Sequence, residues 1–382
     1  MIRVLEVISD ANIGGAGRLL VNKIKYSDKS RFEYIVALPK DSSLIPLLKE
    51  AGANVIQIKA CENKSLDIKG FFALRNIIKK LSPDILNSHA CMSARLAGKF
   101  SSIMVNIYTR HCDFPVNGIF NFSVIRSIYG AFDNYLNDGV IAVSYSAKKN
   151  LLALGVKADN IKVIINGADK LDELSVEKRQ KIRAGLKIPA DAFVISIFAR
   201  LEAYKDHKTF LRAAKALKKN KNMYFLVVGD GSCANELKGY SEKLGIDDHV
   251  RFLGFVDDIS KIMNITDVNV NCSVGTETSS LALSEGMSVG VPAIASDYDG
   301  NKYMVNDGIN GFIFPQRDYV RLANAILCLY RNKTLYNLFS ENARKRFECE
   351  LNAMRMTKET EMLYISKLNE AKGLMKFRNR CN

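Results

Sequence analysis

The first 170 residues alternate short apolar runs, rich in β-branched side chains, with longer stretches whose apolar positions recur every three or four residues. The short runs predict buried strands, and the longer stretches predict amphipathic helices. The expected strands are residues 3–8, 34–38, 54–58, 85–88, 104–109, 140–143 and 162–165. The expected helices lie near residues 16–26, 43–52, 68–81, 91–100, 117–136 and 144–154. Such an alternation is typical of a parallel sheet with helices on both faces.

The second half of the chain repeats this alternation. The expected strands are residues 193–199, 223–228, 251–253, 268–271, 291–295 and 311–314. The expected helices lie near residues 207–219, 232–244, 257–265, 280–288, 317–330, 334–348 and 352–375. The repetition predicts two similar α/β domains with a cleft between them, and in such sheets ligands bind beyond the carboxyl ends of the strands.

The boundary between the two halves is expected near residue 170. Residues 166–190 contain the turn Asn166-Gly167 and then a strongly charged helical stretch, which we interpret as the linker and the start of the second domain. A chain of 382 residues also exceeds one ordinary hydrophobic core. The expected domains are therefore residues 1–170 and 171–350, followed by a helical segment with a basic tail at 351–382.

Composition narrows the class of protein. With 48% hydrophobic and 25% charged residues the chain is globular, and no uncharged apolar run has the length needed to cross a bilayer. The start, MIRVLEVISD, carries Glu6 inside its apolar run and predicts a first strand, not a signal peptide. The eight Cys include no C-x-x-C pair, which favours a reducing cytosol without a disulfide framework or zinc site. A cytoplasmic location is expected.

The formal net charge of +15 allows three kinds of partner: nucleic acid, an anionic membrane surface or phosphorylated small molecules. Nucleic acid has the least support, because the chain shows no helix-turn-helix, zinc-finger or aromatic RNA-binding pattern and contains no Trp. The alternative is that the Lys-rich faces are merely solvated.

Two glutamates, Glu277 and Glu285, lie eight positions apart, where a loop of small residues meets an apolar helix pattern and then a buried-type strand. A carboxylate accepts two parallel hydrogen bonds, which suits the vicinal hydroxyls of a ribose or hexose. A helix N-terminus beside it presents backbone N–H groups to a phosphate. Although the spacing alone arises by chance, this context predicts a sugar-nucleotide site. A polar, Gly-containing turn is expected after the strand.

Three more candidates follow strands of the second domain. Arg200 and Lys205 come after its first strand, where two cations suit a diphosphate leaving group; the alternative is a solvated charged loop. Asp230, between two glycines after the next strand, either lines a nucleotide pocket or belongs to a simple turn. Asp297 and Asp299 resemble an acidic pair that binds Mg²⁺ or Mn²⁺, but we interpret them as coincidental.

The first domain offers a Gly-rich turn and two histidines. Gly14, Gly15 and Gly17 follow the first strand and open a helix, so a phosphate or sugar can approach the backbone; the alternative is a tight turn without a ligand. His89 and His111 each follow a strand. Either could bind a sugar hydroxyl or orient a phosphate, and the alternative for each is a structural histidine. Because the chain has four His in all, no multi-His metal cluster is expected.

Taken together, these segments resemble glycosyltransferase family 4, the large retaining group of GT-B glycosyltransferases, over nearly the whole chain. The matching segments are the Gly-rich turn, His111, INGAD (165–169), ARLEAYKDHKTFLRA (199–213), VVGDG (227–231), FLGFVDD (252–258) and the segment from Glu277 to Glu285. The resemblance implies an α/β GT-B fold, in which two Rossmann-like parallel-sheet domains face a cleft. It also implies an N-terminal acceptor domain, a C-terminal nucleotide-sugar donor domain and C-terminal helices that pack back toward the N-domain.

The resemblance also implies roles for individual residues. The catalytic set is Arg200, Lys205, Glu277 and His111. The donor-binding set is Gly15, Gly17, Asp230, Ser279, Ser280, Leu281 and Glu285. Arg200 and Lys205 would neutralise the diphosphate, Glu277 and His111 would contact the donor sugar, and Glu285 would hold the ribose. No metal or cofactor is required if the Arg, the Lys and a helix dipole supply the charge.

The sequence departs from the family pattern at several positions. The usual Gly-Phe-Gly after the first Glu is Thr278-Ser279-Ser280, and the Ala-Met after the second Glu is Gly286-Met287. The Gly that usually precedes the Arg is Ala199, and the later Gly-Gly turn is Asp299-Gly300. These departures leave the transferred sugar open.

The leading hypothesis is a metal-independent, retaining transferase. It would move a hexose or N-acetylhexosamine from a nucleotide diphosphate sugar, preferably a UDP-sugar, to a cell-surface glycan such as a capsule or lipopolysaccharide. One alternative is a GT-B-like sugar-nucleotide epimerase or phosphorylase. Another is a catalytically inactive GT-B binding protein, and non-specific nucleic-acid binding ranks last.

The acceptor is expected to be lipid-linked in many such enzymes, which would bring the basic first domain to the anionic inner face of the cell membrane. Residues 70–81 are one candidate for an interfacial helix, and the alternative is a core-packed helix with a basic edge. The basic tail, residues 372–380, is a second candidate.

Overall fold

The structure, a computed structural model, describes residues 1–11, 13–62, 64–101, 103–113, 116–275 and 277–381, with side chains of the last helix as far as Leu374. Thr276, in the loop before Glu277, and the side chains at the end of the basic tail lie outside this range. The chain divides into two compact units. Unit 1 is Met1–Gly167 with Ala353–Asn382, and unit 2 is Ala168–Asn352, whereas the expected boundaries follow residues 170 and 350.

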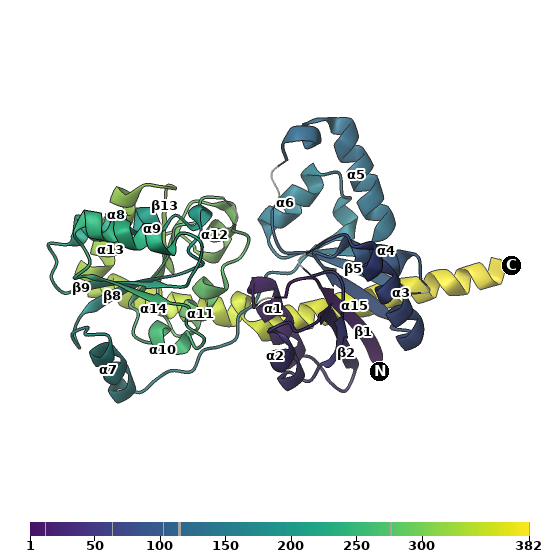
Figure 1. The fold of residues 1–382 in the computed structure, drawn as a ribbon, viewed down its shortest axis with the longest axis horizontal. Coiled ribbons are helices and arrows are strands. Elements are labelled where there is room, and N and C mark those ends of the chain that lie inside the picture. The colour runs from purple at the N-terminus through teal and green to yellow at the C-terminus, as the bar shows by residue number, and fades with distance from the viewer. Residues whose placement is uncertain (12, 63, 102, 114–115, 276, 382) are drawn as a thin grey trace. The chain divides into compact units, whose positions relative to one another are not determined.

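Unit 1 contains a parallel sheet of seven strands in the order β3-β2-β1-β4-β5-β6-β7 (Figure 1). The strands are β1 (Ile2–Ile8), β2 (Phe32–Pro39), β3 (Asn54–Ile58), β4 (Ile85–His89), β5 (Val105–Arg110), β6 (Gly139–Ala142) and β7 (Ile161–Val163). The helices are α1 (Gly15–Lys25), α2 (Ile45–Glu50), α3 (Ile68–Leu81), α4 (Met92–Lys99), α5 (Ser123–Leu136), α6 (Tyr145–Ala153) and α15 (Ala353–Cys381), with short 3-10 turns η1 (Gly118–Asn121) and η2 (Ala158–Asn160).

The alternation of side chains along β1 explains how the unit 1 sheet is covered. Leu5 and Val7 point to one face and pack with α3 and α4 through residues such as Leu74 and Ala94. Glu6 lies between them in sequence and points to the other face, where α1 and α15 pack side by side. Because α3 buries its Gly70, Leu74 and Ile78 side, residues 70–81 form the core-packed helix that was the alternative to an interfacial one.

Unit 2 contains a parallel sheet of six strands in the order β10-β9-β8-β11-β12-β13. The strands are β8 (Phe193–Phe198), β9 (Met223–Val228), β10 (Val250–Gly254), β11 (Val268–Asn271), β12 (Ala293–Ser296) and β13 (Gly311–Phe314). The helices are α7 (Val176–Gly185), α8 (His207–Leu217), α9 (Ala234–Leu244), α10 (Ser260–Met263), α11 (Leu281–Ser288), α12 (Asp299–Met304), α13 (Tyr319–Arg331) and α14 (Lys333–Arg346), with a 3-10 turn η3 (Ala203–Lys205) and a π-helical turn η4 (Phe347–Leu351).

The unit 2 sheet is buried on both faces, as expected for a parallel sheet. Ile195 and Phe225 face a cluster formed with α8, α9 and α13, and Val194 and Leu226 face a second cluster that includes Ile262 of α10. The prediction of a doubly covered parallel sheet in each half of the chain is therefore confirmed.

One local expectation is wrong. The Asp299-Gly300 segment was expected to form a turn after β12, but it begins the helix α12. The glycine is required by packing and not by a left-handed backbone, because a Cβ on Gly300 would lie 1.9 Å from the carbonyl oxygen of Glu277. The helix therefore packs directly against the backbone of a candidate site residue.

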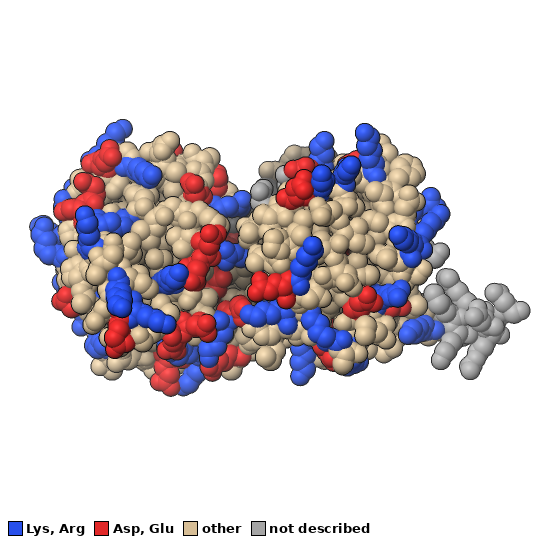
Figure 2. Space-filling view, turned by 60° about the horizontal axis from the view of Figure 1, so that its bottom comes forward, with Lys and Arg blue, Asp and Glu red and all other residues tan. Residues whose placement is uncertain are grey.

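Charged side chains of both signs are visible on the face of the molecule drawn in Figure 2. On the face in Figure 2, Lys and Arg lie interspersed with Asp and Glu on both units. Within the described part of the chain, no helix combines the length and the apolar character needed to span a membrane.

Candidate functional site

The candidate residues of unit 2 converge where the chain reverses its direction across the sheet. After β8 the strands β9 and β10 are added on one side, and the chain then returns to place β11 on the other side of β8. Lys205 lies in η3, beyond the carboxyl end of β8, and Glu277 lies beyond the carboxyl end of β11. Open parallel sheets bind ligands at this switch point, because loops from two neighbouring strands diverge there.

Lys205 and Glu277 form an ion pair at this point. The Lys205 Nζ atom lies 2.6 Å from Glu277 Oε2, and their side chains are 14% and 8% exposed. Asn271 Nδ2 and Ser273 Oγ donate to the same oxygen at 3.0 and 2.9 Å. Burial alone would raise the pKa of Glu277, but the charge of Lys205 and these hydrogen bonds outweigh it and hold the pKa below its ordinary value. Glu277 is therefore an oriented carboxylate anion.

A network of buried polar side chains holds the loop that carries this carboxylate. Ser296 Oγ donates to the Ser273 carbonyl at 2.6 Å, and Asn301 Nδ2 donates to Ser296 Oγ at 3.0 Å and to Asn271 Oδ1 at 3.4 Å. Asn301 belongs to α12, the helix that was expected to be a turn. The network fixes the loop after β11 from two neighbouring segments, so the position of Glu277 is set before any ligand binds.

Arg200 lies in the same loop region as Lys205. Its Nη2 atom donates to Tyr204 Oη at 2.6 Å. The Tyr204 ring centroid is 5.9 Å from the Arg200 guanidinium carbon and 5.4 Å from Lys205 Nζ, so one aromatic ring contacts both cations. Arg200 is exposed and Lys205 half-buried, which places two cations of different accessibility at the end of β8.

Asp230 lies beside this loop, with its side chain exposed. The carbonyl of Asp230 accepts from Leu201 N at 2.9 Å, and a Cβ on Gly229 would lie 2.1 Å from the Ala199 carbonyl. The two strand-end loops thus touch through their backbones, which explains why Asp230 is flanked by glycines. This packing of the two backbones positions Arg200. It gives no indication of a ligand for the Asp230 side chain.

The helix between the two glutamates begins as expected. Ser280 caps α11 through its hydroxyl, which accepts from Leu283 N, and Leu281 is the first helical residue. The Ser279 hydroxyl contacts the sulfur of Met304 at 3.7 Å. Glu285 lies one helical turn beyond Leu281 and is half-buried. The structure thus brings Glu277 together with Lys205, while Glu285 stands further along the adjacent helix.

Gly15 and Gly17, in the Gly-rich turn of unit 1, differ in what surrounds them. A Cβ on Gly17 would lie 2.6 Å from the Leu44 side chain, so helix packing requires this glycine. Gly15 is the first residue of α1, and apart from its chain neighbours and the backbone of its own helix, no heavy atom of the described residues lies within 4 Å of its Cβ position. Space for a ligand therefore exists at Gly15 and not at Gly17.

His111 belongs to a chain of hydrogen bonds with His89 and Glu6. We call these three residues the histidine relay. His111 Nε2 lies 2.7 Å from His89 Nδ1, and His89 Nε2 lies 2.7 Å from Glu6 Oε2. The register of the sheet explains the meeting, because Glu6 of β1 pairs with Asn87 of β4 and Ile8 pairs with His89. His89 and His111, considered singly from the sequence, are thus two parts of one chain of hydrogen bonds.

Glu6, at the buried end of the relay, is also ion-paired. Lys23 Nζ of α1 lies 2.6 Å from Glu6 Oε1, and Tyr364 Oη of α15 donates to the same oxygen at 3.0 Å. Burial would raise the pKa of Glu6, but Lys23 and His89 outweigh it and lower the pKa to about 2. Burial lowers the pKa of His89 and lowers that of His111 well below its ordinary value. Near neutral pH both rings are therefore neutral and Glu6 is an anion.

The acidic pair Asp297 and Asp299 shows no sign of a shared metal site. Asp297 Oδ1 accepts from Gln316 N at 3.1 Å, and Asp299 lies in the first turn of α12. Among the residues that the structure describes, no group of three or more His, Cys, Asp or Glu side chains could hold a metal ion.

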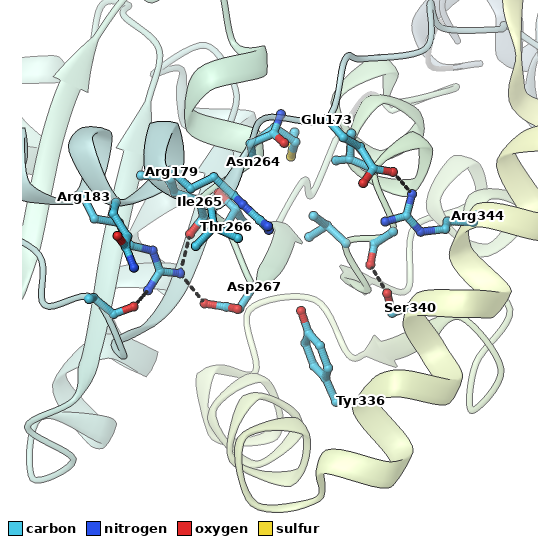
Figure 3. A pocket seen from close by; sticks show the side chains of 17 residues that line it. Glu173, Arg179, Arg183, Asn264, Ile265, Thr266, Asp267, Tyr336, Ser340 and Arg344 are labelled. Atoms are coloured by element: carbon cyan, nitrogen blue, oxygen red, sulfur yellow. Dashed lines mark hydrogen bonds and ion pairs between the residues drawn. The ribbon is translucent and has the colours of Figure 1, made fainter.

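A polar cavity of about 330 Å³ lies elsewhere in unit 2, near the amino ends of β8, β11 and β12 (Figure 3). Two ion pairs line it, Arg183 with Asp267 and Arg344 with Glu173. The first pair joins α7 to the residue preceding β11, and Arg183 also donates to the carbonyls of Ala192 and Ile265. None of the site residues predicted from the sequence lines this cavity.

Comparisons with known proteins identify the family of the chain. The family model described as Glycosyltransferase Family 4 matches residues 13–170, and the one described as Glycosyl transferases group 1 matches residues 178–346. The chain belongs to glycosyltransferase family 4. It is thus a transferase of the GT-B type, as the resemblance implied.

Relatives of this family 4 glycosyltransferase align over most of its length. An Escherichia coli protein named UDP-Gal:alpha-D-GlcNAc-diphosphoundecaprenol alpha-1,3-galactosyltransferase is 25% identical over 92% of this chain and 94% of its own. A Campylobacter jejuni alpha-1,4-N-acetyl-D-galactosaminyltransferase, named for an undecaprenol-linked acceptor, is 25% identical over 91% and 94%. The crystal structure of Anabaena Alr3699/HepE in complex with UDP and glucose superposes with a TM-score of 0.82 at 22% identity, covering 96% and 100% of the two chains.

Several residues at these two sites were not expected from the sequence. Tyr204, Asn271 and Ser273 surround the Lys205–Glu277 pair. Glu6 completes the histidine relay, and Lys23 is its ion-pair partner. The one available signal was the charge of Glu6 inside an otherwise apolar strand, since a buried carboxylate needs a partner.

Proposed function

We propose that this glycosyltransferase transfers a hexose or N-acetylhexosamine, with retention of anomeric configuration and without a metal ion, from a UDP-sugar to a lipid-linked glycan. The observation that carries the proposal is the Lys205–Glu277 pair at the switch point of the unit 2 sheet, with Arg200 beside it. It combines cations for a diphosphate with a fixed carboxylate for sugar hydroxyls.

Lys205 and Arg200 hold the donor diphosphate in this proposal. Negative charge develops on the diphosphate as the bond to the sugar breaks, so cations placed there stabilise the transition state. The N-terminus of α11, at Ser280 and Leu281, adds backbone N–H groups on the same side of the sheet. Because these groups supply positive charge, the transfer proceeds without a divalent cation or any cofactor.

Glu277 orients the transferred sugar and does not attack it. Three donors converge on its Oε2, which disperses the negative charge of that oxygen, while Oε1 accepts from a sugar hydroxyl. The departing phosphate takes the proton of the acceptor hydroxyl, so the same face of the sugar is used for departure and attack. Glu285, further along α11, accepts from the ribose hydroxyls of the nucleotide.

The identity of the donor and acceptor rests on relatives. The Escherichia coli relative is named for UDP-Gal and for a sugar carried on diphosphoundecaprenol, and the Campylobacter jejuni relative is named for an undecaprenol-linked glycan. The structural neighbour from Anabaena contains UDP and glucose. Together they support a UDP-sugar donor and a lipid-linked acceptor in the assembly of a cell-surface glycan such as a lipopolysaccharide or capsule.

An exposed apolar face on unit 1 supports the lipid-linked acceptor. Helix α5 exposes apolar side chains at positions four, four and three residues apart, all on one side of the helix: Val124, Ile128, Phe132 and Tyr135, between 45% and 67% exposed. Lys99 Nζ lies 4.2 Å from the Tyr135 ring centroid and adds a cation at the edge of this face. An apolar helix face with a basic rim fits the inner surface of an anionic membrane, where the protein would bind peripherally from the cytoplasm.

The experiment is a binding panel followed by product analysis. Purified protein is titrated calorimetrically with UDP, GDP, ADP, CMP and dTDP, first in EDTA and then with Mg²⁺. We expect UDP to bind in EDTA, and UDP-sugars with an undecaprenyl-diphosphate acceptor to yield UDP and an α-linked product by NMR. No nucleotide binding, or binding that requires Mg²⁺, contradicts the proposal, and a β-linked product rules out retention from an α-linked donor.

A further inference from the structure

The polar cavity of unit 2 lies at the opposite edge of the sheet from the proposed donor site. Residues that precede β8, β11 and β12 line it, whereas Lys205 and Glu277 follow the carboxyl ends of β8 and β11. Because these strands are parallel, their amino ends and their carboxyl ends lie at opposite edges of the sheet. The cavity volume of about 330 Å³ falls within the range of sites for small molecules. The cavity is therefore a candidate binding site outside the proposed transfer reaction.

One of the two ion pairs in the cavity, Arg183 with Asp267, is fixed by the backbone. Arg183 donates to three backbone carbonyl oxygens and to Asp267 Oδ2, at distances between 2.6 and 3.2 Å. The same carboxylate oxygen accepts from Val194 N at 2.8 Å. The hydrogen bonds of this pair are thus used within the protein, and its two charges offset each other. The pair forms a wall of the cavity and needs no ligand.

The other pair, Arg344 with Glu173, can exchange its carboxylate. The two side chains are 38% and 58% exposed, and an ion pair that is open to water contributes little stability. The guanidinium is held in place by packing, because a Cβ on Gly290 would lie 2.5 Å from Arg344 Nε. Glu173 belongs to the irregular segment before α7, so its side chain can turn to water. An anion that enters the cavity can then take its place at Arg344.

Two more groups face the cavity with hydrogen-bond donors that the protein does not use. In Figure 3 the Arg179 side chain extends from α7 into the space between the two ion pairs, and the Tyr336 hydroxyl of α14 points toward the same space. Neither the Arg179 guanidinium nor the Tyr336 hydroxyl has a hydrogen-bond or ion-pair partner among the residues that the structure describes. Burial, and then the charge of Asp267, raises the pKa of Tyr336, so its hydroxyl stays protonated at neutral pH. Since a guanidinium can only donate, these groups suit a ligand that accepts hydrogen bonds.

We propose that this cavity binds a phosphate group, either free phosphate or the phosphate of a small ester, through Arg179, Arg344 and Tyr336. The donors reach the cavity from two helices, α7 and α14, which suits the tetrahedral array of phosphate oxygens better than the two coplanar oxygens of a carboxylate. Once Glu173 has turned to water, the charged side chains that line the cavity are three arginines and Asp267. Their net charge offsets the charge of about −2 on a phosphate near neutral pH. This binding does not depend on the proposed transferase function.

The first test measures the binding of inorganic phosphate to the full chain by ³¹P NMR titration near neutral pH. Wild type is compared with Arg179→Gln and with Tyr336→Phe. We expect either variant to raise the Kd for phosphate about tenfold, because each removes a hydrogen bond to a charged group. Unchanged Kd values in both variants, or no detectable binding to wild type, overturn the proposal.

A matched control separates the cavity from the general positive charge of the protein. Lys181 is exposed on α7 like Arg179 but does not line the cavity, so Lys181→Gln should keep the Kd for phosphate within about twofold. An equal loss in Lys181→Gln overturns the assignment to the cavity. Both cavity variants are expected to fold, since Arg179 has no partner to lose and Tyr336→Phe keeps the ring that packs against Phe193 at a centroid distance of 6.1 Å.

The second test shows at which edge of the sheet the phosphate binds. Lys205→Ala removes a cation from the proposed donor site and none from the cavity. We expect the Kd for phosphate in Lys205→Ala to stay within about twofold of wild type, whether or not the protein binds UDP. A loss in Lys205→Ala together with an unchanged Kd in Arg179→Gln assigns the phosphate to the donor site and overturns the proposal. Because UDP binding is measured separately, this failure differs from a failure of the proposed function.

The third test identifies the ligand class by competition. Methyl phosphate and acetate are each added to the protein with inorganic phosphate bound. We expect methyl phosphate to displace the ion at a lower concentration than acetate does. Tighter binding of methyl phosphate than of inorganic phosphate supports an ester as the occupant, and the reverse supports the free ion. Displacement by acetate that is as effective as displacement by methyl phosphate overturns the assignment to phosphate.

Discussion

Each unit of this glycosyltransferase contains a buried glutamate paired with a lysine at 2.6 Å, yet the two pairs differ in what else they contact. Glu277 of unit 2 receives its other hydrogen bonds from Asn271 and Ser273, which precede it by six and four residues. Glu6 of unit 1 receives its own from Asn87, His89 and Tyr364, which are 81, 83 and 358 residues away in sequence.

This difference shows why similar ion pairs can have separate tasks. The Lys205–Glu277 pair lies in loops beyond the strand ends. There each side chain can break its contact with the other and bind a substrate group instead. The Glu6 pair lies in the middle of β1 with no exposed surface on its carboxylate, so it can act only through a neighbour such as His89. A ligand can therefore be recognised directly by one pair and only indirectly by the other.

The largest expected effect concerns stability. Glu6→Gln leaves Lys23 buried without an anion, and breaking a buried pair in this way costs about 3–5 kcal/mol of unfolding free energy. Glu277→Gln should cost less than Glu6→Gln, because Lys205 lies in a loop and is 14% exposed, so that it can turn to solvent. Urea unfolding measures both, and the double variant Glu6→Gln/Lys23→Met should recover part of the loss. Equal costs for the two glutamates contradict the distinction.

The second effect is a pH dependence. Burial, and to a smaller extent Lys205, lowers the pKa of His207 from 6.5 to about 4, and neither ring nitrogen has a hydrogen-bond partner among the described residues. The unfolded state binds the proton more readily, so stability is complete above pH 6.5 and is lost as the pH falls toward 4, by about 3 kcal/mol.

Thermal unfolding at pH 7 and pH 4.5 measures this loss. His207→Leu should remove its share of the decrease, while the burial of His89 and His111 continues to act in the same direction in unit 1. Glu6, with its pKa lowered to about 2, contributes at lower pH, between about 4.5 and 2. An unchanged pH dependence in His207→Leu would show that His207 is not buried in its neutral form.

The third effect concerns catalysis. Lys205→Ala removes a cation next to Glu277, and loss of one preorganised charge of this kind lowers transfer by about 100-fold. Initial rates of UDP release with a lipid-linked acceptor measure it. Lys208→Ala is the matched control, since Lys208 is an exposed lysine paired with Glu236 on the surface and should keep its rate within about twofold. A Lys208 variant as slow as the Lys205 variant would contradict the assignment.

The two glutamate–lysine pairs also differ in how far they could be predicted from the sequence. The strands and most helices follow from local apolar periodicity, and the positions of Lys205 and Glu277 after two strands follow from motifs, whereas the ion pair between them was not expected. The segment Asp299-Gly300 was wrongly expected to be a turn. Its glycine is required by the close approach of the Glu277 carbonyl oxygen and not by a left-handed backbone. The contact between Glu6 and Tyr364 depends on the packing of α15 against β1, and no local pattern encodes a partner 358 residues away.

The smallest effect on stability concerns the exposed face of α5. Ile128→Ser and Phe132→Ser should change unfolding free energy by less than about 0.5 kcal/mol, since neither side chain is buried. The same variants should reduce flotation with anionic liposomes, whereas Leu338→Ser, an exposed apolar site on unit 2, should not. Unchanged liposome binding in the α5 variants would exclude this face as the membrane contact.

The most direct test of the account compares UDP affinity with transfer rate in wild type, Lys205→Ala and His89→Phe. Lys205→Ala should weaken UDP binding at least tenfold by calorimetry and abolish most transfer. His89→Phe should leave UDP affinity within twofold and lower only the transfer rate, because the histidine relay belongs to unit 1 and the proposed diphosphate site belongs to unit 2. If His89→Phe weakens UDP binding as strongly as Lys205→Ala, or if Lys205→Ala binds UDP normally, the division of tasks between the two glutamate–lysine pairs is wrong.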